Sequence, residues 1–291
     1  MFQGSIVALV TPFRDGALDE PAFRALIEWH LAEGTQGFVP VGTTGESPTL
    51  THPEHERVIE LCIGTVGGRV PVIAGTGSNS TAEAISLTRH AKRAGADAAL
   101  VVTPYYNKPT QEGLYAHFRA IHDAVDLPLI IYNIPGRSVV DMAPETMARL
   151  AKLPNIVGVK DSSADIMRPL LTQAGCGGEF CQLSGEDGNV VAFLAHGGHG
   201  CISVTANVAP RLCAELHRAW QAGRPGEALA LHRRLLPLHQ ALFCETSPAP
   251  AKYALSRLGR CADEVRLPLV ALSERARAQV DAALAAVGLT N

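Results

Sequence analysis

Lysine is scarce in this chain of 291 residues, in which five lysines stand against twenty arginines. Arginine thus supplies almost all of the positive charge. A lysine at a special position is then expected to do what a guanidinium cannot, because a primary amine can lose its proton and attack a carbonyl carbon. The place of each lysine along the chain is therefore informative.

Long runs of charge and long apolar runs are also missing. Charged residues make up 18% of the chain and the formal net charge is −3, so neither nucleic acid nor a membrane surface is expected as a partner. The first residues lead straight into a strand-like segment, without the charged leader and apolar stretch of a signal peptide. No apolar run reaches the roughly 18 residues that a membrane span needs. We expect a cytoplasmic protein.

Cysteine and histidine give no metal signature. The seven cysteines include no C-x-x-C pair, which predicts reduced, mostly buried thiols. Two His-x-x-His pairs, His52/His55 and His196/His199, come without a matching set of carboxylates or cysteines. We predict a structural or ligand-facing role for these histidines and no required metal.

Short apolar segments rich in β-branched residues recur along the chain, with helical patterns between them. Because they are apolar on both faces, they indicate a parallel sheet covered by helices. Capping boxes are predicted at Thr51-x-x-Glu54 and Ser80-x-x-Glu83. The predicted strands span residues 5–12, 37–42, 70–76, 98–104, 128–134, 156–161, 182–186 and 200–205.

Eight strand–helix units favour a closed (β/α)₈ barrel of the α/β class, the TIM barrel, over an open doubly wound sheet. A glycine-rich segment at residues 75–80 lacks the third glycine of a dinucleotide-binding motif, so we discount it. We predict the barrel over residues 1–222. A C-terminal helical region, residues 223–291, is expected to pack on it.

Lys160 closes the apolar strand 156–161. In a barrel of this type the reacting groups gather at the C-terminal ends of the strands. A lysine that leaves the sheet and points to solvent is the ordinary alternative, and Lys160 alone would not exclude it. The other polar groups at predicted strand ends favour a reactive amine.

Several of those groups have chemistry to offer. Thr43 and Thr44 lie between glycines, where backbone N–H groups and two hydroxyls could hold a small carboxylate. Tyr132 and Tyr106 could relay protons. Arg137 follows Pro-Gly and could grip a carboxylate with two hydrogen bonds. Taken singly, each is better explained as a cap, a packed ring or a surface charge, but together they would lie on one rim.

The motifs that carry these residues closely resemble the dihydrodipicolinate synthase family, also called 4-hydroxy-tetrahydrodipicolinate synthase. This family belongs to the pyruvate-dependent Schiff-base lyases, which include N-acetylneuraminate lyase. The likeness covers roughly residues 1–222 and thins in the C-terminal helices, where residues 247–252 still resemble the family's Asn-Pro-x-x-x-Lys stretch. The matching motifs are residues 42–47, 104–109, 132–137, 158–161 and 197–207.

The resemblance implies that Lys160 forms an imine with pyruvate and that no external cofactor is needed. Thr43 and Thr44 would hold the pyruvate carboxylate. Tyr132 would act as general acid and base, linked through Thr44 to Tyr106, which in this family comes from the neighbouring subunit. A homo-oligomer, a tetramer built as a dimer of dimers, is therefore expected.

The resemblance also implies the second substrate, L-aspartate 4-semialdehyde, with Arg137 on its carboxylate. Main-chain carbonyls of Gly185 and Ile202 would line the pocket. The product would be 4-hydroxy-tetrahydrodipicolinate, in the first committed step of diaminopimelate and lysine biosynthesis.

Residues 160–163, Lys-Asp-Ser-Ser, resemble instead some sugar-acid enzymes of the superfamily. A 2-keto-3-deoxy sugar-acid aldolase or dehydratase is thus the alternative function. A catalytically silent barrel is a further hypothesis, which borohydride trapping of a pyruvate adduct distinguishes from an enzyme.

Free L-lysine is a possible effector by the same resemblance, at a site distinct from Lys160. The matching side chains can bind an amino acid. They are Ser47, His52, His55, Asn79, Glu83 and Tyr105.

Overall fold

The computed structural model describes residues 2–290. Within that range, eight parallel strands belong to one sheet in the order β4-β1-β10-β9-β8-β7-β6-β5. Strands that follow one another in the chain are neighbours in this order, except β4 and β5 at its two ends, and β10 returns to lie beside β1. This is the order of a (β/α)₈ barrel, so the predicted fold class is confirmed. The strands are β1 (Gly4–Ala8), β4 (Gly37–Val39), β5 (Ile73–Gly75), β6 (Ala98–Val102), β7 (Leu129–Asn133), β8 (Ile156–Asp161), β9 (Cys181–Ser184) and β10 (Gly200–Ser203).

All eight predicted strands exist, but most end earlier than predicted. The residues that follow the last ladder hydrogen bond turn into loops, and these loops carry most of the candidate site residues. A small antiparallel hairpin of β2 (Phe13–Arg14) and β3 (Ala17–Leu18) was not predicted.

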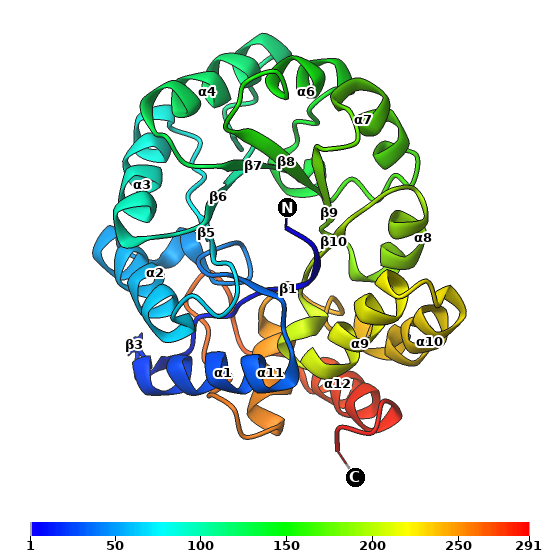
Figure 1. The fold of residues 1–291 in the computed structure, drawn as a ribbon. Helices are drawn as coiled ribbons and strands as arrows, with labels where there is room; N and C mark the ends of the chain where they lie inside the picture. The colour runs from blue at the N-terminus through cyan, green and yellow to red at the C-terminus, as the bar shows by residue number, and fades with distance from the viewer. Residues whose placement is uncertain (1, 291) are drawn as a thin grey trace. The chain divides into compact units, whose positions relative to one another are not determined.

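The chain divides into two compact units. Residues 71–202 form most of one unit, in which helices lie outside strands β5 to β9 (Figure 1). Its helices are α3 (Thr81–Ala94), α4 (Gln111–Ala124), α5 (Pro135–Ser138), α6 (Pro144–Leu150), α7 (Arg168–Cys176) and α8 (Val190–Ala195), the last preceded by the 3₁₀ turn η2 (Asp187–Asn189).

Residues 4–70 and those from 203 onward form the other unit. Here α9 packs on α10, and α12 packs on both α10 and α11. A barrel–extension boundary at residue 222 stays a prediction. The helices and turns are α1 (Glu20–Glu33), η1 (Ser47–Thr49), α2 (His52–Val66), η3 (Thr205–Asn207), α9 (Pro210–Gln221), α10 (Pro225–Ala241), α11 (Ala249–Arg257) and α12 (Glu274–Ala286).

Helix starts follow the capping signals. Thr51 caps α2 and Glu54 bonds back to the Thr51 N–H at 2.9 Å, so the first predicted capping box is confirmed. Ser80 caps α3, but the Ser80 N–H donates to the Ser78 hydroxyl at 3.0 Å, and that hydroxyl also contacts the Glu83 carboxylate. In place of the second predicted box, Ser78, Ser80 and Glu83 form a local group of hydrogen bonds at the start of α3.

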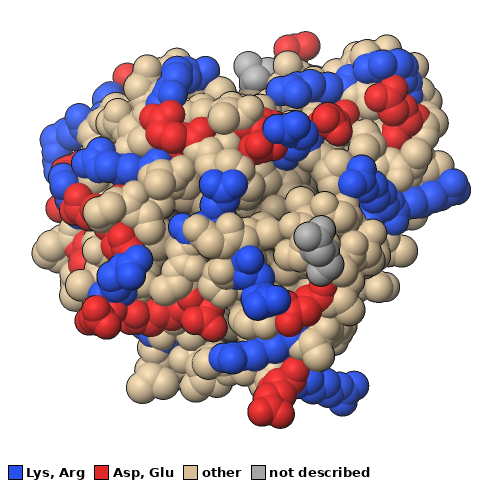
Figure 2. Space-filling model, turned by 90° about the horizontal axis from the view of Figure 1, so that it is seen from below, with Lys and Arg blue, Asp and Glu red and all other residues tan. Residues whose placement is uncertain are grey.

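The surface carries both signs of charge. Figure 2 shows one face, on which Lys and Arg side chains are interspersed with Asp and Glu. Among residues 2–290, no helix combines the length and the apolar character that crossing a membrane requires. The seven cysteines, all within this range, form no disulfide.

Candidate active site

Lys160 and Tyr132 lie side by side at the ends of two neighbouring strands. The register of β7 and β8 pairs them directly. The Nζ of Lys160 is 4.0 Å from the centroid of the Tyr132 ring, and each residue is only 6% exposed. A lysine that points to solvent is therefore excluded. The amine is held against the face of the Tyr132 ring, and the hydroxyl of that ring is the phenol of the same pair of strands.

Gly185, which follows β9, borders the Lys160 side chain. A Cβ atom at this position would lie 2.9 Å from Cε of Lys160 and 1.9 Å from Oγ of Ser162. A larger residue would displace the Lys160 and Ser162 side chains from these positions, so glycine leaves room for them beside the amine. Ile202 is fully buried in β10, next to Cys201, which pairs with Ser184 of β9. That the Gly185 and Ile202 carbonyls line the pocket stays a prediction.

Glu186 is a titratable group near Lys160 for which no role was predicted. Burial raises the pKa of its carboxyl above the usual value of 4.5, and the positive charge of Lys160 opposes that shift. A carboxyl with a raised pKa can exchange a proton with a nearby amine.

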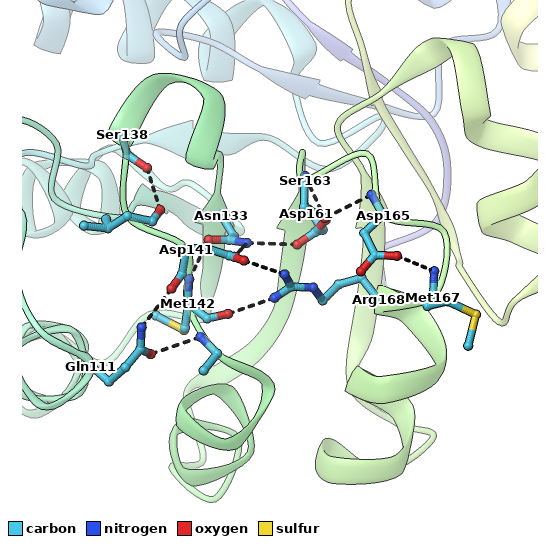
Figure 3. Close-up of polar contacts among 12 residues, drawn as sticks. Gln111, Asn133, Ser138, Asp141, Met142, Asp161, Ser163, Asp165, Met167 and Arg168 are labelled. Atoms are coloured by element: carbon cyan, nitrogen blue, oxygen red, sulfur yellow. Dashed lines mark hydrogen bonds and ion pairs between the residues drawn. The ribbon is translucent and has the colours of Figure 1, made fainter.

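Asn133 and Asp161 come one residue after Tyr132 and Lys160 and are also paired in register. Figure 3 shows their side chains meeting behind the two strand ends, with Asp141 and Arg168. Neither residue had a predicted role. The available signal was that two adjacent strands each end in a reactive side chain followed by a short polar one.

Arg137 lies in the short helix α5 and is exposed. It makes no ion pair with any residue in the range 2–290 that the structure describes, and its guanidinium remains available to an anionic ligand. Ser138 anchors the same turn, because its hydroxyl oxygen lies 2.9 Å from the Ile134 carbonyl oxygen and 3.0 Å from that of Val140, and its one proton can be donated to either.

Tyr106 faces away from its own unit. It is 89% exposed and has a left-handed backbone, with φ of 72°. Such a backbone is uncommon for a tyrosine and marks a turn that other contacts must stabilise. The Asn107 side chain supplies one of these contacts, since it donates to the Asn79 carbonyl at 2.9 Å.

Thr43 and Thr44 occupy a tight turn after β4, in the other unit. Thr44 is buried and Thr43 is half-buried. A Cβ at Gly45 would lie 2.9 Å from the Val41 nitrogen, so the turn requires glycine there. The Thr11 hydroxyl donates to the Gly45 carbonyl at 2.7 Å and holds the turn from β1's side.

Glu46 fixes the end of this turn through a buried ion pair. The Nζ of Lys252, in α11, lies 2.5 Å from Oε1 of Glu46, and the Arg266 N–H donates to Oε2 at 3.0 Å. Lys252 Nζ also donates to the Glu264 carbonyl at 2.7 Å and lies 4.1 Å from the Phe13 ring centroid. Burial lowers the pKa of Lys252, and the Glu46 carboxylate opposes that shift.

The residues predicted to bind L-lysine are divided between the two units. In one, the Asn79 amide donates to the Tyr105 carbonyl at 3.2 Å, and Glu83 lies at the start of α3. In the other, Ser47 begins η1, while His52 and His55 lie in the first turn of α2.

The second histidine pair binds backbone groups. Nδ1 of His199 accepts from the Gln182 N–H at 3.1 Å, and Nδ1 of His196 is 2.5 Å from the Ile166 carbonyl oxygen. Among residues 2–290, no three His, Cys, Asp or Glu side chains are grouped as metal ligands.

Known proteins are similar to this chain over nearly its whole length. Residues 1–287 match the model of the dihydrodipicolinate synthetase family. The 4-hydroxy-tetrahydrodipicolinate synthase of Rhodospirillum centenum is 68% identical over 289 residues, which is 99% of both chains.

Two solved structures add ligands to the comparison. The dihydrodipicolinate synthase of Acinetobacter baumannii, complexed with pyruvate, is 47% identical with a TM-score of 0.97 over 100% of both chains. The enzyme of Cyanidioschyzon merolae, with lysine bound, is 39% identical with a TM-score of 0.96 over 99% of both chains.

Proposed function

The chain belongs to the dihydrodipicolinate synthetase family, and we propose that it condenses pyruvate with L-aspartate 4-semialdehyde through an imine on Lys160. The product is 4-hydroxy-tetrahydrodipicolinate, in the first committed step of diaminopimelate and lysine biosynthesis. The observation that supports the site is the buried Lys160 amine, held over the Tyr132 ring next to Gly185, where a Cβ atom would contact the lysine side chain.

The reaction follows from imine chemistry. The Lys160 amine attacks the keto carbon of pyruvate, and water leaves to give a protonated imine. This imine withdraws electrons, so a methyl proton is lost and an enamine forms. The enamine carbon attacks the aldehyde of the second substrate. The amino group of that substrate then displaces Lys160 and closes the ring, so the lysine takes the part of a cofactor.

The other residues bind and move protons. Thr43 and Thr44 hold the pyruvate carboxylate, and Tyr132 transfers protons at the imine. Tyr106 acts from a neighbouring subunit, and its 89% exposure supports this, because the side chain projects away from its own chain. The active site would then be complete only in a homo-oligomer, for which we propose a tetramer built from two such dimers.

Arg137 selects the second substrate. An exposed guanidinium suits a short substrate that carries its own carboxylate, whereas a sugar acid would present hydroxyl groups there. Together with the family match, this favours the synthase over a sugar-acid aldolase or dehydratase.

A coupled assay with pyruvate and aspartate semialdehyde tests this function. The wild type should turn over both substrates. Arg137→Ala should raise the KM for the semialdehyde about tenfold or more and lower kcat, while pyruvate imine formation stays intact. A wild type that acts only on sugar acids would reject the proposed function. An Arg137→Ala variant impaired in pyruvate binding alone would reject the role proposed for Arg137.

L-lysine is a proposed effector of this enzyme, because a related enzyme has been solved with lysine bound. Glu83 would bind the ammonium group, while Asn79 and Tyr105 would bind the carboxylate. Tyr105 is adjacent to Tyr106, so a ligand there could change the position of the proton-relay tyrosine.

A further inference from the structure

A network of polar side chains lies at the ends of β7 and β8, the strands that carry Tyr132 and Lys160 (Figure 3). Since successive side chains of a strand point to opposite faces, Asn133 and Asp161 lie on the face of β7 and β8 opposite to Tyr132 and Lys160. We call four side chains the strand-end network: Asn133, Asp141, Asp161 and Arg168.

Asn133 is the centre of this network and is completely buried. Its amide donates to Oδ2 of Asp161 at 3.1 Å and to Oδ1 of Asp141 at 2.7 Å. Its carbonyl oxygen accepts from the Met142 N–H at 3.0 Å. Both amide hydrogens and the oxygen are used, so this side chain has a single orientation.

Arg168 closes the network from the first residue of α7. It donates to Oδ2 of Asp141 at 2.6 Å and to the Met142 carbonyl at 3.0 Å. Its side chain is largely buried, whereas that of Asp141 is about half exposed. A buried guanidinium with two directed acceptors fixes the segment that it contacts more firmly than a surface pair does.

The same contacts fix both ends of the loop that carries Arg137. Residue 133 begins this loop, and residues 141 and 142 end it. Gln111 adds to the far end, because its amide donates to the Asp141 carbonyl at 2.8 Å and accepts from the Ala143 N–H at 3.0 Å. Asp161, in turn, directly follows Lys160, and its carboxylate accepts from the Ser163 N–H at 3.0 Å.

We propose that the strand-end network is a positioning device for the second substrate, which holds the Arg137 loop at a fixed place relative to Lys160. The network touches no reacting atom. Through Asn133 it ties the loop to the carboxylate of Asp161, one residue beyond the imine-forming lysine of β8. The carboxylate that Arg137 binds is thereby set at a constant distance from the enamine carbon, on which carbon–carbon bond formation depends. This inference rests on the proposed function.

Arg168→Gln tests the proposal, because it removes the charge and one directed bond and leaves the pyruvate pocket untouched. The KM for aspartate semialdehyde should rise about tenfold, with kcat lowered. The rate of borohydride trapping with pyruvate alone should not change. Arg168→Lys should recover part of the loss, since an ammonium can still pair with Asp141. Arg149→Gln is the matched control. It breaks an exposed bidentate pair with Glu112 in the same unit and should leave both substrates unaffected.

Asp141→Asn provides a second variant should Arg168→Gln fail to fold, and the same rise in the semialdehyde KM is expected. An unchanged semialdehyde KM in a folded variant would overturn the proposal. So would an equal loss of pyruvate trapping, which would mean a merely structural role. A wild type inactive with the two substrates would instead reject the proposed function.

Discussion

The ammonium nitrogen of Lys252 lies 2.5 Å from Oε1 of Glu46, and neither side chain is exposed to solvent. The pair joins α11 to the turn that carries Thr43 and Thr44, across 206 residues of sequence. A helix of the C-terminal region is therefore part of the support for the proposed carboxylate cradle.

Breaking this pair should destabilise the protein strongly. Lys252→Met leaves the Glu46 carboxylate buried without its partner, and the free energy of unfolding in urea should fall by about 3–5 kcal/mol. The double variant with Glu46→Gln should lose less, because no unpaired charge remains. Lys92→Met, which removes an exposed pair with Asp126, should cost no more than about 1 kcal/mol. Equal losses for Lys92→Met and Lys252→Met would contradict this account.

Buried His30 should make stability fall in mild acid. Burial lowers the pKa of its ring from 6.5 to about 3, and the positive charge of Arg260 adds to the effect. Below pH 6.5 the unfolded chain binds a proton at this site that the folded chain does not, so stability is lost as the pH falls from 6.5 toward 3. At pH 5 the contribution is about 2 kcal/mol.

Urea unfolding at pH 7 and pH 5 measures this effect. His30→Gln should lose less stability between the two pH values than the wild type does. His52→Gln, at an exposed histidine of α2, should follow the wild type. The assignment fails if His30→Gln shows the wild-type pH dependence.

Tyr106 should act across a subunit interface. Tyr106→Phe and Lys160→Arg should each be nearly inactive alone. After subunit exchange, a mixed dimer would hold one site with both native residues, and roughly a quarter of the wild-type activity should return. No recovery in demonstrably mixed dimers would place Tyr106 in the site of its own chain.

L-lysine should inhibit at a site other than Lys160. Titrating millimolar L-lysine into the coupled assay should lower activity, and Glu83→Ala should abolish that response without removing activity. Glu112→Ala, at an exposed carboxylate of α4, should remain sensitive. Wild-type activity that does not change with L-lysine would refute the effector, and inhibition that persists in Glu83→Ala would refute the site.

Local patterns predicted the strands well, because apolar runs bounded by glycine and proline report on burial without knowledge of partners. Lys160 was identified because it ends such a run in a chain poor in lysine, and because the polar groups at the other strand ends and the family resemblance indicate the same chemistry. The contacts between Asn133 and Asp161 depend on the register of two strands, which no local pattern encodes. The pair of Lys252 and Glu46 depends on an approach of residues distant in sequence, and the raised pKa of Glu186 depends on burial.

The central claim is that Lys160 forms the imine, and borohydride reduction in the presence of pyruvate tests it most directly. Mass spectrometry should place one reduced pyruvate adduct on Lys160 of the wild type. Lys160→Arg should fold and give no adduct, since a guanidinium does not form it. Lys152→Arg, at an exposed lysine of the same unit, should still be labelled at Lys160. An adduct on another lysine, or one that survives in Lys160→Arg, would contradict the account.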